Sequence, residues 1–283
     1  SCLMSNPCSA IETAFHKVQE LIIEADSEGK VHAQRSGTTA TVVFHHMRER
    51  NMYIAHVGDS RCVLAKHQVP GSAVSDGLEA DDSADASGSA SLASPVFEAS
   101  ALTEDHKPQV LEEKARIEAG GGQVRFDGVG QHRVYVHGQR YPGLNMSRCL
   151  GDLKGWKFAG LSCEPSICVC PLVQSPVEAS AFHSSEAEAA VKSINFSDDS
   201  GEASKNSESL RHRPPASSYS SGSQSVGSRM LHLDADRLLL ICTDGVWEVM
   251  NPQEAIKICA REALTDAQAA TSRLTSNVWD RWV

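Results

Sequence analysis

Two aspartates follow apolar runs typical of buried strands, and each has a glycine beside it. Asp59 closes the stretch YIAHVGDS and Asp244 closes LLLICTDG, with Glu248 four residues further on. A buried strand holds its last residue rigidly, and carboxylate oxygens are the hard ligands that Mg²⁺ and Mn²⁺ prefer. One Asp-Gly pair after a strand is usually only a turn. Two such pairs and a neighbouring glutamate favour a divalent-metal site.

Cysteine and histidine chemistry has less support. None of the nine cysteines has an arginine six residues later, which a phosphate-binding cysteine loop would require. Cys168 and Cys170 share one face of a predicted strand because strand side chains alternate. Core packing is the favoured interpretation of this pair, and metal or redox use stays open. The twelve histidines include no HExxH motif and no paired Cys/His spacing, which disfavours zinc.

Periodicity predicts the elements that must position these residues. Ser9 to Glu12 form a capping box, and apolar residues follow at helical spacing. Short links between the first three strands favour an antiparallel meander. The expected helices cover 9–26, 108–120, a segment capped by Asn251, and 266–282; the expected strands cover 38–44, 52–57, 61–65, 123–126, 166–172 and 237–243. Strands in meanders with helices grouped apart from them indicate an α+β layered domain.

Composition limits the possible functions. The chain has 283 residues, 41% of them hydrophobic, and no apolar run approaches the ~20 residues of a membrane span. Its net charge of −10 disfavours nonspecific nucleic-acid binding. An odd number of cysteines and no signal sequence at the start predict reduced thiols in the cytoplasm or nucleus.

The negative charge is concentrated in two Ser-rich stretches. Residues 70–101 hold six acidic residues and no Lys or Arg, and residues 174–228 hold seven acidic and four basic residues. Such small, polar segments bury too little apolar surface to offset the entropy of ordering a backbone. We therefore expect one domain over 1–283 with disordered insertions at 70–101 and 174–228. Solvated loops are the favoured interpretation, and a regulatory role is the alternative.

Four segments, in order, resemble the metal-dependent protein serine/threonine phosphatases of type 2C, the PPM family. The segments are SGTTATVVF with YIAHVGDSRCVLAK, then ALTEDHKPQVLEEKARIEAGGGQV, then LNMSRCLGDLKGWKF with CEPSI, and finally LLLICTDGVWEVMNPQEAI. The resemblance runs from about residue 36 to residue 264 and is interrupted at the Ser-rich stretches. It implies an α+β sandwich of two antiparallel β-sheets flanked by α-helices.

The resemblance also implies a chemistry. Members hydrolyse phosphoserine and phosphothreonine in phosphoproteins at a centre of two or three Mg²⁺ or Mn²⁺ ions, where a metal-activated water attacks phosphorus. Asp244 matches a metal-ligand aspartate of the family. Asp59 matches the aspartate of a GDSR turn near a third, weaker metal position, and Glu248 stands near the same position where many members have Asp. Trp156 lies in GWKF, which corresponds to the substrate-side flap.

Two family motifs have no counterpart in this chain. The resemblance implies an upstream DGHGG-type motif, but residues 1–35 contain no Asp-Gly, and no Asp-Asn or Asp-Asp pair follows the last helix. We therefore expect a monomeric phosphatase that is incomplete at both ends and inactive as this chain, with no catalytic residue identifiable in it. The alternatives are a pseudophosphatase that acts as a protein-binding module, and an unrelated metal hydrolase with histidine ligands.

Overall fold

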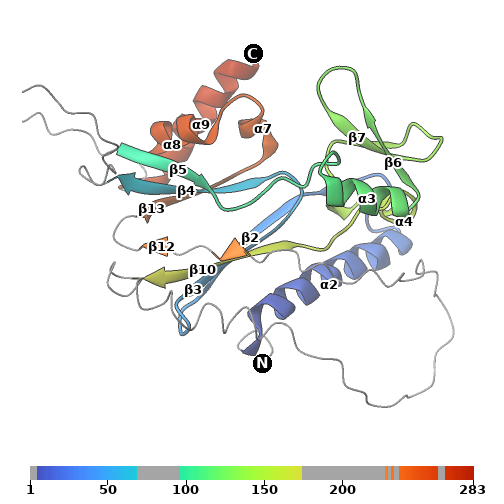
Figure 1. The fold of residues 1–283 in the computed structure, drawn as a ribbon, viewed down its shortest axis with the longest axis horizontal. Coiled ribbons are helices and arrows are strands. Elements are labelled where there is room, and N and C mark those ends of the chain that lie inside the picture. Colours follow the sequence, from blue (N-terminus) through green and yellow to red (C-terminus); the bar gives the residue numbers. More distant parts are fainter. Residues whose placement is uncertain (1–4, 69–95, 174–226, 229–230, 233–235, 261–264) are drawn as a thin grey trace, which may run out of the picture. The chain divides into compact units, whose positions relative to one another are not determined.

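The computed structural model divides the chain into two compact units, each formed from two separate parts of the sequence. Unit 1 comprises residues 1–59 and 105–232, and unit 2 comprises residues 60–104 and 233–283. The expectation of one domain over 1–283 stays a prediction. The structure describes residues 5–68, 96–173, 227–228, 231–232, 236–260 and 265–283 (Figure 1).

The main sheet of unit 1 is antiparallel at its centre. β2 (Ala40–His46) and β3 (Asn51–Val57) form a hairpin, and β3 also pairs with β10 (Ser166–Val173). Two short strands, β11 (Gly227–Ser228) and β12 (Leu231–His232), pair in parallel with β10. The sheet therefore holds β3 between two partners, so that its last residues are fixed from both sides.

The helix α2 (Pro7–Ser27) covers one face of this sheet (Figure 1). Its residues Ile11 and Phe15 belong to the same buried cluster as strand residues of β3 and β10. The helix begins earlier than the sequence pattern predicts, because Asn6 accepts a hydrogen bond from the Ser9 N–H at 3.2 Å. The expected capping box at Ser9 and Glu12 is therefore wrong: Asn6 directly precedes a proline, and that pair caps the helix first.

A second, smaller sheet of unit 1 joins β6 (Gly122–Phe126), β7 (His132–Val136) and β8 (Pro142–Leu144) in antiparallel order. Two helices pack beside it, α3 (Leu111–Ala119) on β6 and the short α4 (Leu153–Phe158) on β7. Both Ile117 and Val134 are fully buried in this core. The two-residue strands β1 (Gly37–Thr38) and β9 (Leu150–Gly151) pair with each other nearby in the same unit.

Unit 2 is a three-stranded antiparallel sheet covered by helices. β4 (Arg61–Gln68) lies between β13 (Asp236–Cys242) and β5 (Val96–Ala101). Three helices follow β13: α7 (Asp244–Trp247), α8 (Pro252–Cys259) and α9 (Ala267–Trp282). Their apolar faces form one core with the sheet, which includes Val63, Leu240, Ile256 and Leu274.

Two expectations about these strands are wrong. The strand predicted at 61–65 does not continue a meander with β3, because β4 pairs with β13 and β5 in the other unit. Residues 96–101, predicted to be the end of a disordered insertion, form β5 instead. Side chains alternate between the two faces of a strand, and Phe97 is buried on the inward face of β5. This short local pattern forms a strand even though the longer stretch is polar on average. Residues 69–95 and 174–226 lie outside the described residues.

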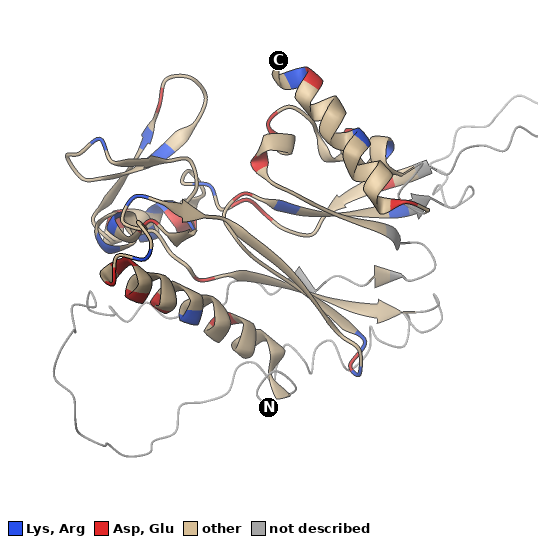
Figure 2. Cartoon of the chain, turned by 180° about the vertical axis from the view of Figure 1, so that it is seen from behind, with Lys and Arg blue, Asp and Glu red and all other residues tan. Residues whose placement is uncertain are grey.

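The fold is α+β, with antiparallel sheets and helices, as the sequence predicts. Acidic and basic residues lie mainly on helices and turns, while the strands are mostly uncharged (Figure 2). Among the helices that the structure describes, none is long and apolar enough to cross a membrane.

Candidate functional site

The end of β3 places Asp59 in a buried turn of unit 1. Gly58 has φ +97°, and a Cβ on it would lie 2.3 Å from Cγ2 of Thr39, so only glycine fits this turn. The Asp59 side chain is 1% exposed. Its Oδ2 accepts a hydrogen bond from the ammonium of Lys107, and its Oδ1 is buried without a partner. The carboxylate that the sequence predicted as a metal ligand is therefore neutralised by a lysine.

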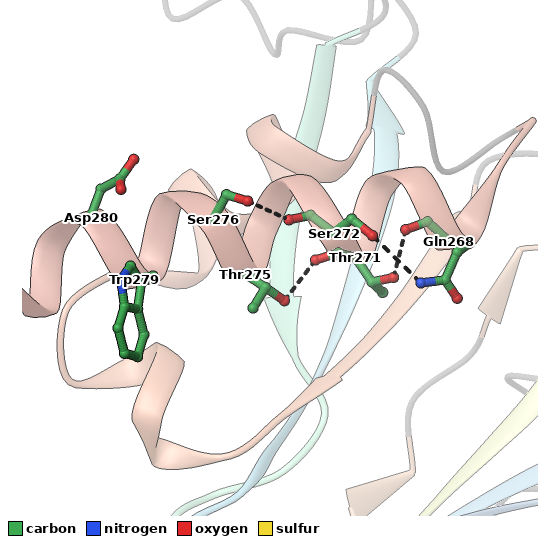
Figure 3. Close-up of a pocket in the computed structure, with 7 residues that line it drawn as sticks. All are labelled: Gln268, Thr271, Ser272, Thr275, Ser276, Trp279 and Asp280. Atoms are coloured by element: carbon green, nitrogen blue, oxygen red, sulfur yellow. Dashed lines mark hydrogen bonds between the residues drawn. The ribbon is translucent and has the colours of Figure 1, made fainter.

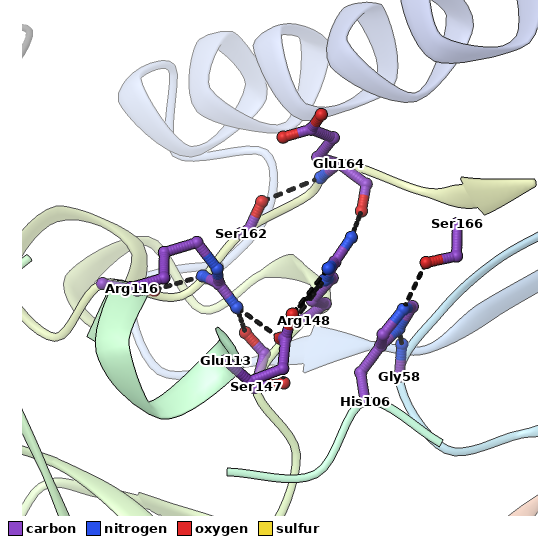
Figure 4. Close-up of polar contacts among 10 residues, drawn as sticks. Gly58, His106, Glu113, Arg116, Ser147, Arg148, Ser162, Glu164 and Ser166 are labelled. Atoms are coloured by element: carbon purple, nitrogen blue, oxygen red, sulfur yellow. Dashed lines mark hydrogen bonds and ion pairs between the residues drawn. The ribbon is translucent and has the colours of Figure 1, made fainter. Parts of the chain in front are cut away.

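His106 braces the same turn. Its Nδ1 accepts a hydrogen bond from the Gly58 N–H at 3.1 Å, and its Nε2 lies 2.9 Å from Oγ of Ser166 (Figure 4). The His106 ring also stacks on His56, with ring centroids 4.4 Å apart. Burial, followed by the charges of His56 and Arg148, lowers the pKa of His106 to about 2. The ring is therefore neutral and serves as a fixed hydrogen-bonding bridge between the turn and β10.

A buried ion-pair network lies beyond this turn in unit 1 (Figure 4). Glu113 of α3 pairs with Arg148 at 2.5 Å and with Arg116 at 2.5 Å, and Ser147 donates a hydrogen bond to it. Burial raises the pKa of Glu113, but the hydrogen bonds and charges of the two arginines outweigh it and hold the pKa at about 2. Arg148 also donates to the carbonyl of Glu164 at 3.0 Å. Because a backbone bond at 2.8 Å joins the N–H of Ser147 to the carbonyl of His106, the network also supports the turn.

Asp244 is the first residue of α7 in unit 2, and Glu248 directly follows the last one. Asp244 is half-buried and Glu248 is exposed, and four residues of separation on a helix place them on one face. Within the part of the chain that the structure describes, neither carboxylate has a side-chain partner. The joint between β13 and α7, residues 242–247, is rigid. Trp247 Nε1 donates to the carbonyl of Cys242 and Trp282 Nε1 donates to the carbonyl of Gly245, both at 2.8 Å.

The helix behind this joint begins as the sequence predicts. Asn251 accepts a hydrogen bond from the Glu254 N–H at 3.0 Å, and the Glu254 carboxylate accepts one from the Asn251 N–H at 3.2 Å. Pro252 occupies the first helical turn. This reciprocal cap and the buried Ile256 hold α8 against the sheet, so that the loop after α7 has a defined end.

The described residues do not form a complete divalent-metal centre. No three His, Cys, Asp or Glu side chains among them are close enough to hold an ion together. Asp59 faces an ammonium, which takes the position beside its Oδ2 that a cation would occupy. Asp244 and Glu248 fit an oxygen-ligand pair because they share a helix face and have open oxygens, but two monodentate carboxylates fall short of the six or more ligands of such ions.

Trp156, predicted to shape substrate access, lies on α4 in unit 1. Its side chain is 42% exposed, and the neighbouring Phe158 is 50% exposed. Lys157 lies between them, with its ammonium 5.3 Å from the centre of the Phe158 ring. The short helix thus presents two aromatic rings and a cation to solvent, which suits contact with a partner or substrate but does not by itself identify one.

Several residues of these sites have no marker in the sequence. His106 and Lys107 are adjacent in the chain, yet only the fold brings them to the turn at Gly58. Glu113 has a usable signal: it lies four residues before Ile117, on the inward face of α3, where a charged residue requires a partner. Nothing in the sequence identifies Arg148 as that partner.

One surface hollow of unit 2 carries no such chemistry. It lies along the outer face of α9 and has a volume of about 530 Å³. Its hydroxyl groups are bonded within the helix, since Thr275 donates to the carbonyl of Thr271 and Ser276 to that of Ser272 (Figure 3). Trp279 closes one end and is 68% exposed. The hollow is an open stretch of helix surface rather than a catalytic pocket.

Comparison with known proteins identifies the family. The family described as Protein phosphatase 2C matches residues 2–179 and 211–280, and the chain belongs to it. "Probable protein phosphatase 2C 12" of Oryza sativa subsp. japonica is 37% identical over 121 residues, 42% of this chain and 24% of that protein. "Probable protein phosphatase 2C 73" of Arabidopsis thaliana is 34% identical over 131 residues, 46% of this chain and 28% of that protein. The matched region thus spans about a quarter of these relatives.

Solved structures show the same fold. A serine-threonine phosphatase 2C from Toxoplasma gondii aligns over 96% of this chain and 60% of its own, with a TM-score of 0.55 and 17% identity. A C. elegans sex determining protein aligns over 95% of this chain and 42% of its own, with a TM-score of 0.52 and 16% identity. The family and the fold expected from the sequence are therefore confirmed.

Proposed function

We propose that this protein is a protein serine/threonine phosphatase that hydrolyses phosphoserine and phosphothreonine with Mg²⁺ or Mn²⁺ as cofactor. Asp244 would serve as a metal ligand in this proposal, and Asp59 and Glu248 remain metal-ligand candidates from the family resemblance. Trp156 contributes to the substrate side. A bound divalent ion would supply an acidified water and neutralise phosphate charge. The described residues do not hold the complete ligand set, so no catalytic step is assigned to them.

The single observation that carries the proposal is the match to the phosphatase family over most of the chain. The local structure around Asp244 supports it. A buried strand and two tryptophan hydrogen bonds fix the joint, while the carboxylate itself has no side-chain partner in the described part of the chain. A rigid frame around an uncommitted carboxylate is what a metal ligand requires.

The test is Mn²⁺-dependent hydrolysis of a phosphothreonine peptide. Three proteins are compared: residues 1–283, the chain extended by the sequence that flanks it in its transcript, and the extended chain with Asp244→Asn. We expect hydrolysis only by the extended, unsubstituted chain. Asp266→Asn in the extended chain is the matched control, because Asp266 caps α9 and has no part in the proposed site.

Hydrolysis by residues 1–283 alone would contradict the expectation that this chain lacks ligands. Full activity of the Asp244→Asn extended chain would contradict the role of Asp244. If the extended chain binds Mn²⁺ but hydrolyses no phosphopeptide, the phosphatase proposal itself fails.

A second candidate is a binding module without catalysis. The ion pair between Asp59 and Lys107 favours it, because a lysine already neutralises a carboxylate that the family resemblance assigns to an ion. Lys107→Met in the extended chain separates the candidates: the module predicts no gain of Mn²⁺-dependent hydrolysis, whereas an enzyme restrained by Lys107 predicts a gain.

We further propose phosphoproteins as partners, a monomeric state, and location in the cytoplasm or nucleus.

A further inference from the structure

The strand β10 carries two thiols in close approach. The Sγ atoms of Cys168 and Cys170 lie 3.6 Å apart in unit 1. Cys170 is fully buried and Cys168 is half-buried, so the pair is reachable from the Cys168 side. Pairing with β3 fixes the backbone at both positions. The two sulfurs therefore form a preorganised pair that the proposed phosphatase chemistry does not use.

A third sulfur faces the same side of the sheet. Met52 of β3 lies directly opposite Cys170 in the antiparallel register. Residues paired in this way project to the same face, with Cβ atoms about 4.5–5.5 Å apart. The flexible Met52 side chain is half-buried, and its thioether can reach the thiol pair from there.

This face is distinct from the face that α2 covers. Ile167 and Val169 alternate with the cysteines along β10, and both pack in the α2 cluster. Cys168 and Cys170 therefore project away from α2. Ile54, paired with Cys168, is fully buried on the same face. Two thiols and a thioether are soft ligands, which suit a soft metal ion better than a hard one.

A disulfide is the alternative use of two such thiols, and strand geometry opposes it. Residues two apart in a strand have Cα atoms roughly 6.6 Å apart, at the far limit of the disulfide range. The sulfurs would also have to close from 3.6 Å to a bond of about 2.05 Å. A bridging ion needs no such movement, because metal–thiolate bonds of about 2.3 Å let one ion contact both sulfurs at their present separation.

We propose that Cys168, Cys170 and Met52 bind one Cu(I) ion. Each thiol releases its proton to solvent and its sulfur donates an electron pair to copper, while the Met52 thioether donates without losing a proton. Copper remains Cu(I), so no oxidant is needed. Thiolate and thioether ligands in a low-coordinate set select Cu(I). Zinc would need four ligands, and within the described ranges no group of three His, Cys, Asp or Glu side chains forms around an ion.

The test is anaerobic competition for Cu(I) between residues 1–283 and the chelator bicinchoninate. We expect one equivalent of Cu(I) to be bound, with Cys168→Ser weakening the affinity at least about 100-fold and Met52→Leu about tenfold. Cys8→Ser is the matched control, because Cys8 is also a half-buried thiol of unit 1 and lies on α2. Its affinity should stay within about twofold of the unsubstituted chain.

Folding is checked by circular dichroism and denaturant unfolding without copper. Cys168 is half-buried, so its serine variant should keep the fold, and Cys170→Ala provides a second variant with no buried hydroxyl. The proposal is overturned if Cys168→Ser binds Cu(I) as tightly as the unsubstituted chain. It is equally overturned if bicinchoninate removes all copper from the unsubstituted chain, or if Cys8→Ser loses as much affinity as Cys168→Ser.

Discussion

The ends of β3 and β13 look alike in the sequence and differ in the structure. Both are apolar strands that lead to an aspartate with a glycine beside it, Asp59 in unit 1 and Asp244 in unit 2. Asp59 is buried and neutralised by Lys107, and its turn is braced by His106. Asp244 is half-buried in a joint that two tryptophan side chains fix by donating to backbone carbonyls, and its carboxylate has no side-chain partner in the described part of the chain. One carboxylate thus contributes to the fold, while the other is available for a ligand.

The largest loss of stability should come from disrupting the buried ion-pair network of unit 1. Glu113→Gln removes the carboxylate that pairs with the guanidinium of Arg148, which is 4% exposed, and with that of Arg116. Breaking a buried ion pair in this way costs about 3–5 kcal/mol. The free energy of unfolding in urea measures it. Glu112→Gln, one residue away and exposed, should change stability by less than about 0.5 kcal/mol; equal effects for both variants would contradict the account.

The same carboxylate predicts a pH dependence. The pKa of Glu113 falls from 4.5 in an unfolded chain to about 2 in the folded one. As the pH falls, Glu113 is therefore protonated in the unfolded chain before it is protonated in the folded chain. The stabilisation by the ionised carboxylate is complete above about pH 4.5 and is lost as the pH falls toward about 2. The difference between the free energy of unfolding at about pH 5 and that at about pH 3 should be smaller in Glu113→Gln than in the unsubstituted chain. The same divergence in both would assign the acid sensitivity to other groups.

Removal of the Lys107 ammonium should cause the next largest loss of stability. Lys107→Met leaves a carboxylate that is 1% exposed without its cation, which we expect to cost about 3 kcal/mol. Asp59→Asn in the same background removes the unpaired charge and should recover part of the loss. A double-mutant cycle of the two substitutions measures the coupling. A coupling near zero would mean that the ion pair does not stabilise unit 1.

The cap of α8 should have a smaller effect. Asn251→Ala removes the side-chain acceptor for the Glu254 N–H and should destabilise the protein by about 1 kcal/mol in thermal unfolding. Asn251→Asp keeps an acceptor at the same place and serves as the control. If both variants unfold alike, the cap does not stabilise the segment behind Asp244.

Elements that depend on interactions between near neighbours are predictable from this sequence, whereas pairings between distant segments are not. Local patterns predicted α8 and α9 and the cap at Asn251, because these depend on neighbours within one or two turns. They missed the pairing of β4 with β13, which joins distant segments, and they placed β5 in an insertion because composition was averaged over a longer stretch. The strand-end pattern alone treats Asp59 and Asp244 alike, since only long-range folding brings Lys107 to one of them.

The most direct test of this comparison combines activity and stability for Asp244→Asn in the extended chain. An uncommitted metal-ligand carboxylate predicts that Mn²⁺-dependent hydrolysis of the phosphothreonine peptide falls at least about 100-fold, while the free energy of unfolding without metal changes by less than about 0.5 kcal/mol. Retained hydrolysis, or a loss of activity that follows a loss of stability of several kcal/mol, would contradict the distinction between Asp244 and Asp59.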